Sequence, residues 1–456
     1  MLKTQFYKIA PQLKGQVWFN NDHQFQVRKK VFNHSIDNEP FAIVEVHCEK
    51  DICLVIRFAN THNLAISVKG GGHSNTGSCI VNNGIVIDMS AFKSIVLAQD
   101  KKTVVVGAGV KNMELDVFTA QYGLAVPLGT CPDVGVIGAT LGGGIGFLSR
   151  KFGLTCDSLL NVTMINADGT KMIINQHCEP DLFWGLRGGG GCQFGVITAM
   201  ELKVYQVPQT VFGGIIEWPI SEAKSVLEQY SKQVLIGSRD YFLYAYISRA
   251  NKKQAKISIM GFSSAPQQES ETFFNRVSDW GLDAISDVCE KTYLEMQSNS
   301  YESELSIYWR NGFITGALSS EFLEEVIRCY EICPDNYGGI MFDPLGGAVQ
   351  DRTINETAFV HRGSHFICSV TGVCEGPILH SSVKSWVDDS HNNLSTFYNG
   401  RAYQNYEYLG DNELFVYFGE NSNKLVELKQ KHDPHGRFFG SLNRHISYKS
   451  NLIYSK

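Results

Sequence analysis

The sequence predicts an α+β protein with a glycine-rich first part and a second part in which an antiparallel sheet is backed by helices. Residues of about 40 to 207 combine short β-branched runs with glycine clusters, whereas residues of about 208 to 400 alternate longer helical stretches with strands. The 456 residues are 43% hydrophobic and 19% charged, which is typical of a globular chain with a sizeable core. We therefore expect two domains, or one large domain with an insertion.

The first part contains many apolar runs that are bounded by glycine, asparagine or aspartate. This pattern is typical of strands and turns. They cover residues 41–48, 64–72, 84–90, 102–110, 161–170 and 194–207. Between them, residues 49–63 and 111–124 repeat apolar side chains at intervals of three and four, the helical period. Helices packed on mixed sheets are the expected result.

In the second part, residues 221–235 and 268–282 have the helical pattern, and residues 241–249 and 255–262 have that of strands. Strands with one apolar face, alternating with helices, favour an antiparallel sheet covered by helices. The last segment, residues 412–439, is expected to be a strand-like run and then a helix that ends at Asp-Pro-His-Gly.

The charge balance argues against nucleic acid or a membrane as a partner. The formal net charge is -6 with a pI of about 6.1, and no block of basic residues occurs. The N-terminus lacks the apolar core of a secretory signal, and no stretch approaches a membrane span. We expect a cytoplasmic protein, which the scattered arrangement of the 12 cysteines also favours.

No metal site is expected. Cys329 and Cys333 are spaced to lie one helical turn apart, but their neighbourhood offers no further zinc ligands. His361 and His365 stand four residues apart in a segment that contains glycine and is predicted to be extended chain. Zinc signatures of the H-E-x-x-H type are absent as well.

Three glycine clusters, residues 69–77, 129–147 and 187–198, carry the functional signal. Loops of bare backbone allow close approach to a ligand, and their amides can donate to phosphate oxygens. Simple turns are the alternative explanation of any one cluster, but three together favour a long ligand such as a dinucleotide. Because the G-x-G-x-x-G and phosphate-loop motifs are absent, such a ligand requires a fold with other binding loops.

The order of these motifs resembles that of the berberine bridge enzyme-like family of FAD-linked oxidases. The resemblance rests on residues 69–74, 129–147, 181–198, 401–408 and 420–434, and residues 210–335 match no motif. It implies a two-subdomain FAD-binding domain of the PCMH type, the vanillyl-alcohol oxidase fold, over residues 1–207. A substrate-binding domain over residues 208–400 and a C-terminal segment, residues 401–456, that returns to the FAD domain complete the implied organisation.

The resemblance implies a flavin bound through two covalent bonds, to His73 and to Cys131. An ordinary buried thiol is the alternative for Cys131, and Cys156 is a less suitable candidate because it lies past the glycine-rich turn. Two attachments would raise the flavin potential and leave the substrate side open, which predicts a spacious site. The other implied cofactor contacts are Lys69, Gly70, Gly71, Gly72, Ser74, Asn75, Pro132, Val134, Gly135, Gly138, Ala139, Thr140, Gly142, Gly143, Gly144, Gly146, Gly195, Ile197 and Asn405. The family usually has asparagine at the position of Gln193. We expect the backbone of the third glycine loop to keep its role despite this difference.

The implied reaction is hydride transfer from a substrate C–H bond to flavin N5, followed by reoxidation with O2. Val134 resembles the position at which the family controls access of oxygen, and valine there favours an oxidase, although ordinary packing would also explain it. A dehydrogenase of the same fold that uses another acceptor, and a non-catalytic flavin-binding protein, remain alternatives. The expected partners are a small-molecule substrate and O2.

A substrate alcohol must also lose its hydroxyl proton, so the site needs a base. Tyr406 matches the active-site tyrosine of the family, and Tyr403 is the second candidate. Since the ordinary pKa of tyrosine is about 10, a neighbouring charge or hydrogen bond must assist. Asp343 aligns with an acidic residue that helps the tyrosine in carbohydrate oxidases, and a turn before proline is its alternative role.

The substrate cannot be named from the sequence, because the pocket residues fall in the unmatched region. Met341 and Ser369 stand where oligosaccharide oxidases place glutamines, which makes a sugar substrate less favoured. Tyr241, Tyr244 and Tyr246 alternate along one predicted strand, where they would either stack on a ring or pack in the core. Alcohol, sugar and natural-product oxidation therefore stay open.

Overall fold

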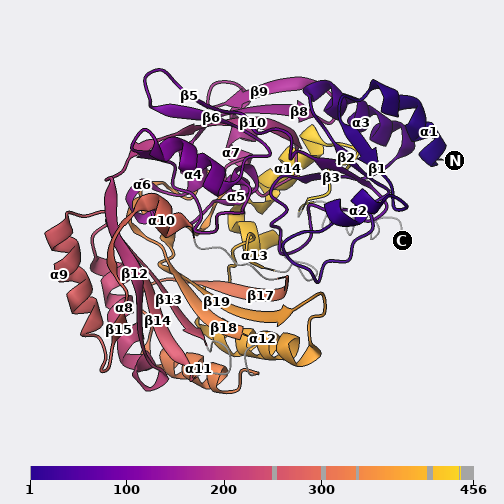
Figure 1. The fold of residues 1–456 in the computed structure, drawn as a ribbon. Coiled ribbons are helices and arrows are strands. Elements are labelled where there is room, and N and C mark those ends of the chain that lie inside the picture. The colour runs from indigo at the N-terminus through magenta and orange to yellow at the C-terminus, as the bar shows by residue number, and fades with distance from the viewer. Residues whose placement is uncertain are drawn as a thin grey trace.

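The computed structural model describes residues 2–248, 254–298, 304–334, 338–407, 414–440 and 442, and it confirms the α+β class. Figure 1 shows two layers of structure. The strands from the first 206 residues and the C-terminal helices lie on one side, and a large sheet with its own helices lies on the other. Within the described residues, no helix has the length and apolar character needed to cross a bilayer.

The first sheet has the order β1-β2-β4-β3, with β1 Gln16–Trp18, β2 Ala42–Glu45, β4 Ile85–Asp88 and β3 Ile66–Lys69. β2, β4 and β3 are parallel, and β1 is antiparallel to β2. Helix α3 (Glu49–His62) is the crossover from β2 to β3, two parallel strands that lie on either side of β4. Helices α1 (Leu2–Ile9) and α2 (His23–Arg28) precede it.

The second sheet is antiparallel and has the order β5-β6-β10-β8-β9. Its strands are β5 Ile95–Leu97, β6 Thr103–Gly107, β10 Gly195–Lys203, β8 Leu159–Asn166 and β9 Lys171–Asn175. The helices of this part are α4 Asn112–Ala120, α5 Val136–Gly142, α6 Ser149–Phe152 and α7 Pro180–Gly185, and β7 Leu124–Ala125 pairs with β11 Tyr205–Gln206.

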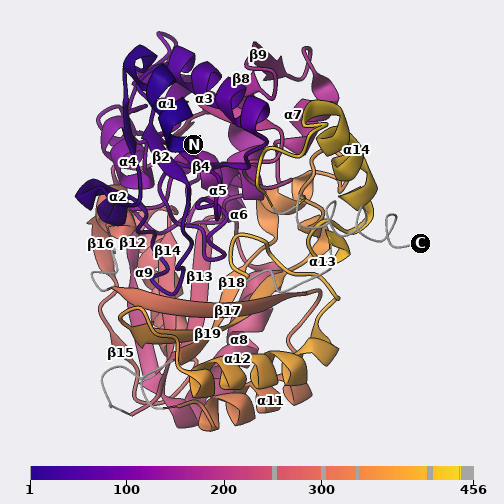
Figure 2. The same cartoon turned by 90° about the vertical axis from the view of Figure 1, so that its right-hand side faces the viewer.

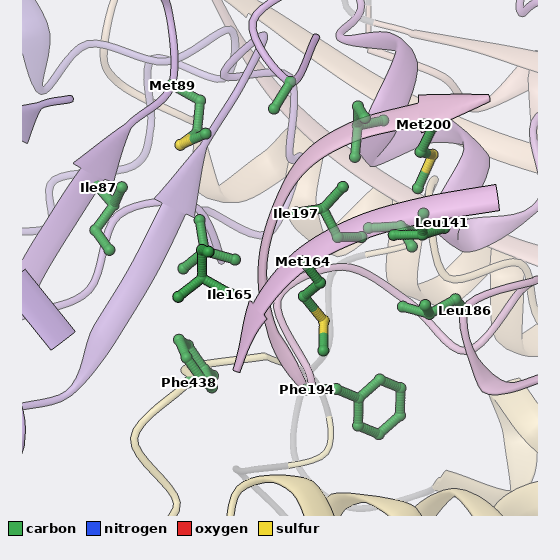
Figure 3. Close-up of a cluster of buried hydrophobic side chains, with 14 of the residues drawn as sticks. Ile87, Met89, Leu141, Met164, Ile165, Leu186, Phe194, Ile197, Met200 and Phe438 are labelled. Carbon is green, nitrogen blue, oxygen red and sulfur yellow. The ribbon is translucent and has the colours of Figure 1, made fainter. Parts of the chain in front are cut away.

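Both of these sheets contribute to one hydrophobic core. Figure 3 shows Ile87 of β4 near Ile165 and Met164 of β8, with Phe438 from the C-terminal segment beside them. Each of these four side chains is at most 1% exposed. The two sheets therefore form one packed unit, and the described end of the chain belongs to it.

The large sheet is antiparallel and has the order β15-β12-β14-β13-β18-β19-β17, with β16 also paired to β12. Its strands are β12 Thr210–Pro219, β13 Tyr241–Ser248, β14 Lys256–Ser263, β15 Ile285–Ser286, β16 Cys289–Thr292, β17 Leu305–Ile314, β18 Gly338–Pro344 and β19 Phe366–Glu375. The predicted antiparallel sheet backed by helices is thus confirmed.

One face of this sheet packs on helices α8 Ala223–Ile236, α9 Gln267–Ser278, α11 Ser320–Glu331 and α12 Ser381–Leu394. Figure 2 shows α8, α11 and α12 together beyond the strands, on the side away from the first domain. The other face is turned toward the first domain, where Phe242 and Phe262 pack with Phe147. A short helix, α10 (Tyr293–Gln297), contacts α4. Strand alternation therefore leaves one face of the sheet available for a site.

The C-terminal segment differs from its prediction at its start. Residues 414–418, predicted to be strand-like, form helix α13 (Leu414–Phe418), while 412 and 413 lie outside the described residues. The apolar run favours a strand by propensity, but Tyr417 and Phe418 are buried in the first core, and packing decides the conformation of so short a run. Helix α14 (Ser422–His432) ends before Asp433, as predicted, and packs against α7.

The segment predicted to be extended around His361 also differs in part. His361–Gly363 forms a short 3₁₀ turn, and β19 begins only at Phe366. The His361 ring stacks on Phe313 with centroids 4.0 Å apart, and its Nε2 lies 2.9 Å from the Tyr417 carbonyl oxygen. The histidine thus joins β17 to α13.

Candidate active site

A cavity of about 840 Å³ lies between the glycine loops of the first domain and the free face of the large sheet. Residues of all three glycine clusters form its roof, and strands β13, β17, β18 and β19 supply its floor. The segment that carries Tyr403 and Tyr406 closes one wall. Groups that are far apart in the sequence therefore meet in one space.

Most of the predicted site residues line this cavity. They are Gly70, Gly71, Gly72, His73, Ser74, Asn75, Cys131, Val134, Gly135, Gly138, Ala139, Gly144, Gly195, Ile197, Asp343, Tyr403, Asn405 and Tyr406. The first two glycine loops meet backbone to backbone, since a Cβ at Gly71 would lie 2.3 Å from the Gly135 nitrogen. Glycine at both positions brings His73 and Cys131 to the same cavity.

Lys69, Pro132, Thr140, Gly142, Gly143 and Gly146 do not line the cavity formed by the described residues. The Lys69 ammonium donates instead to the carbonyl oxygens of Arg28 and Lys30, at 2.5 and 3.1 Å. The Thr140 hydroxyl donates to the carbonyl oxygen one helical turn earlier, at 2.7 Å. These polar side chains are already satisfied within the protein.

Packing within the protein and backbone conformation explain why the other three residues of this group are glycines. A Cβ at Gly142 would lie 1.9 Å from Asn405 Oδ1, and one at Gly146 would lie 1.8 Å from the Leu128 carbonyl oxygen. At Gly143 the backbone has φ of +131°, a value that side chains rarely allow. Their side chains are absent because the protein itself occupies the space.

His73 is held by an aromatic stack. Its ring lies 3.9 Å from that of Phe32 between centroids, at an interplanar angle of 19°. Burial lowers the pKa of His73 to about 4, although Asp133 opposes the shift. The imidazole is therefore neutral at pH 7, with a nitrogen lone pair free to form a bond.

Cys131 is half-buried, and its carbonyl oxygen accepts a hydrogen bond of 2.9 Å from the Asn112 amide. Burial raises the pKa of its thiol. Cys156 is fully buried and does not line the cavity, and burial raises its pKa to about 12. Two thiols that the sequence reasoning missed, Cys79 and Cys192, do line the cavity.

Tyr406 and Asp343 form a polar pair that joins the wall to strand β18 of the floor. The Tyr406 hydroxyl donates to Asp343 Oδ1 at 3.3 Å, and Asp343 Oδ2 has no partner among the described residues. Burial raises the pKa of Asp343 to about 7, and burial together with this carboxyl group raises the pKa of Tyr406 further above its ordinary value. The group that titrates near neutrality is therefore the aspartate.

The Tyr403 hydroxyl accepts two hydrogen bonds, from the Gly144 nitrogen and from the Asn405 side-chain amide, both 2.9 Å long. Burial raises the pKa of Tyr403. The same Asn405 amide donates to the Ala139 carbonyl oxygen at 3.3 Å. Tyr403 thus fixes the second glycine loop to the wall, which favours a positioning role over that of a base.

Three further contacts hold the wall against strand β17. The Trp309 ring stacks on Tyr406, with centroids 4.4 Å apart and an angle of 17°. Arg310 donates to the buried carboxylate of Glu407 at 2.8 Å, and Asn311 Oδ1 accepts from the Tyr403 nitrogen at 2.7 Å. Sequence reasoning missed these residues because β17 lies in the unmatched region, although the alternation of Ile307, Trp309 and Asn311 marks one strand face.

The tyrosines of β13 separate as a strand requires. Tyr244 and Tyr246 line the cavity, whereas Tyr241 stacks on Phe273 of α9 on the helix side, with centroids 3.7 Å apart. Among the described residues, no group of histidine, cysteine and carboxylate side chains could hold a metal ion.

The fold and the site define an FAD-linked oxidoreductase. Residues 40–174 match the family described as FAD binding domain. An FAD-linked oxidoreductase of Dictyostelium discoideum is 27% identical over 96% of this chain and 96% of its own. (R)-6-hydroxynicotine oxidase of Paenarthrobacter nicotinovorans is 24% identical, over 93% and 95%.

Among solved structures, BBE-like 1 of Physcomitrella patens superposes with a TM-score of 0.88 at 22% identity. The superposition covers 96% of this chain and 97% of the other. The chain is thus similar, over most of its length, to FAD-linked oxidoreductases that include berberine bridge enzyme-like proteins.

Proposed function

We propose that the protein is an oxidase that takes a hydride from a C–H bond of an alcohol, hemiacetal or natural-product substrate and passes the electrons to O2. The pairing of Tyr406 with Asp343, inside the cavity that His73 and Cys131 also line, carries this proposal. When bound, the flavin would supply the hydride acceptor at N5. The name of the hydroxynicotine relative also describes an oxidase.

The residues present fit FAD. The cavity of about 840 Å³ is lined by glycines from all three loops, so backbone rather than side chain would face the dinucleotide. His73 is neutral, and Cys131 is a free thiol. We propose that His73 would hold the flavin at its 8α-methyl group and Cys131 at C6, each new bond replacing a flavin C–H bond, with O2 as the acceptor of the two electrons released.

Tyr406 and Asp343 would accept the proton that the substrate hydroxyl loses. The substrate hydroxyl would donate to the Tyr406 oxygen while the tyrosine passes its own proton to Asp343 Oδ1, which already accepts its hydrogen bond. Because the pKa of Asp343 is about 7, the carboxylate that receives the proton is well populated at neutral pH. The tyrosine then need not exist as a phenolate, for which its raised pKa is unsuited.

Val134 lines the cavity and is half-buried. A side chain of this modest size would leave room for O2, and this supports an oxidase over a dehydrogenase. Residues 1–207 would bind FAD, residues 208–400 would bind the substrate, and residues 401–456 would complete the FAD domain, with 408–413, 441 and 443–456 outside the described part. The cytoplasmic location stays a prediction.

The test is a visible spectrum of the purified protein, followed by acid precipitation and intact mass. Yellow colour in the pellet and a mass raised by one FAD are expected, and His73→Ala and Cys131→Ala should each leave one bond. Stopped-flow mixing of the reduced protein with air should then reoxidise the flavin rapidly. A colourless protein that takes up no FAD would refute the proposal, and slow reoxidation would indicate the dehydrogenase.

A further inference from the structure

Three polar atoms on the cavity side of the large sheet have no hydrogen-bond partner among the described residues. They are Trp309 Nε1, Asp343 Oδ2 and Thr371 Oγ1. All three side chains line the cavity, where Asp343 is 5% exposed and Thr371 is 7% exposed. A buried polar group without a hydrogen-bond partner destabilises the protein, so these atoms are suited to a ligand that satisfies them.

The strand register separates these groups along the floor. Thr371 of β19 lies opposite Trp309 on β17 and opposite Gly339 on β18. Asp343 follows Gly339 by four residues on the same strand and lies opposite Ile367. At a rise of about 3.4 Å per residue, the Thr371 and Asp343 positions are about 14 Å apart along the strand direction.

The floor between the two ends is apolar and aromatic. Met341 stands midway along β18, opposite Tyr246 on β13, and both line the cavity. Trp309 lies flat against Tyr406 at the side. At the Thr371 end, Gly339 has no side chain and so leaves the floor open.

The cavity carries little charge. Among the described residues that line it, Asp343 is the single carboxylate, and neither lysine nor arginine occurs. An anionic substrate would lose its hydration without gaining a counter-ion, which is unfavourable. A polyol would place many hydroxyl groups against Met341 and the aromatic rings.

From this arrangement, which rests on the proposed oxidase function, we infer the substrate class. The substrate is an uncharged, elongated molecule with a largely apolar, ring-containing body. Its oxidised hydroxyl meets Tyr406 and Asp343, and a hydrogen-bond acceptor at its far end meets the Thr371 hydroxyl. Thr371 is therefore a residue that determines specificity at a site remote from the reacting carbon.

Isothermal titration calorimetry on the FAD-loaded protein, with its flavin reduced beforehand under anaerobic conditions, measures binding of the probes without their oxidation. The probes are a biphenyl-methanol with a para-methoxy group on the far ring and its para-ethyl analogue, which replaces the acceptor oxygen by CH2. The methoxy probe should bind the wild type about fivefold more tightly, the value of one neutral hydrogen bond. Thr371→Val should abolish this preference, and Thr371→Ser should keep it. Thr210→Val, an exposed position of β12 outside the cavity, is the matched control.

Three further probes test length and charge: benzyl alcohol, a biphenyl-methanol with a para-carboxylate on the far ring, and cellobiose. Each should bind more weakly than the methoxy probe, by about tenfold or more. Benzyl alcohol lacks the second buried ring, the carboxylate would lose its hydration without a counter-ion, and the hydroxyl groups of cellobiose would lie against an apolar floor. The inference would be overturned if the wild type bound the methoxy and ethyl probes equally, or if Thr371→Val weakened the binding of both probes equally. Tighter binding of the carboxylate probe or of cellobiose, or no binding of either biphenyl, would also overturn it. Flavin content and turnover are recorded separately, so a failure of the oxidase proposal would be seen independently.

Discussion

Replacing Asp343 by asparagine should stabilise the protein at neutral pH while it damages the site. The pKa of this buried carboxyl is about 7 in the folded protein, against 3.8 for an exposed aspartate. The difference corresponds to about 4 kcal/mol, because one pKa unit corresponds to 1.36 kcal/mol. Above about pH 7, the raised pKa therefore lowers the stability of the native state by about this amount.

The sign follows from where the proton resides. Between about pH 4 and pH 7 the unfolded chain has released the proton while the native Asp343 still holds it, so rising pH favours unfolding. Above about pH 7 both states are ionised and the penalty stays constant. The stability advantage of Asp343→Asn over the wild type should therefore grow by about 4 kcal/mol from pH 4 to pH 8.

Urea unfolding of the FAD-loaded proteins, followed by tryptophan fluorescence at several pH values, measures this difference. Asp351→Asn is the matched control, because Asp351 is exposed and Arg239 lowers its pKa, so its substitution should have a small effect of opposite sign. A difference between Asp343→Asn and wild type that does not change with pH would refute the reasoning.

The same carboxyl should control the rate of flavin reduction by substrate. Ionised Asp343 accepts the proton in the proposed mechanism, so the wild-type rate should rise through about pH 7 and level off above it. In Asp343→Asn the rate should be low and this inflection should be lost. Rapid-mixing absorbance measurements across the pH range would show both effects.

The other predictions concern the base, the tail and the flavin bonds. Tyr406→Phe should slow substrate reduction of the flavin by about 10² to 10⁴, with an unchanged flavin spectrum; a rate near wild type would exclude Tyr406 from proton transfer. Lys429→Met should lower the free energy of unfolding in urea by about 3–5 kcal/mol, because it removes the ammonium that lies 2.6 Å from the buried carboxylate of Asp433. Lys424→Met, at an exposed ion pair, should lower it by less than about 1 kcal/mol. The flavin bonds are followed by intact mass after FAD is added to the apoprotein. Attachment through Cys131 should become faster as the pH rises, because the pKa of the thiol is raised, whereas attachment through neutral His73 should change little between about pH 6 and pH 8. A Cys131 reaction that does not depend on pH would contradict this assignment.

Local patterns predicted much of the fold, because helix and strand periods depend on neighbouring residues. Such patterns predicted the helices α3, α4, α8 and α9 and the strands β2, β3, β4, β6, β8, β10, β13 and β14. Residues 414–418 were predicted wrongly, since five apolar residues fit a strand and a buried helix equally well. Contacts with a distant core, which no local pattern contains, decided their conformation.

By itself, the sequence determined the class of the protein. Its three glycine clusters predicted a long ligand, and the resemblance of their order to a known family predicted an FAD-linked fold with a spacious site near His73, Cys131 and Tyr406. Only the tertiary structure decided which glycines face the cavity, such as Gly71, and which make room for the protein itself, such as Gly142. It also placed Trp309 on Tyr406 and left the Thr371 hydroxyl without a hydrogen-bond partner among the described residues. The physical reason is that backbone periodicity is a local property, whereas close contact and burial depend on segments hundreds of residues apart.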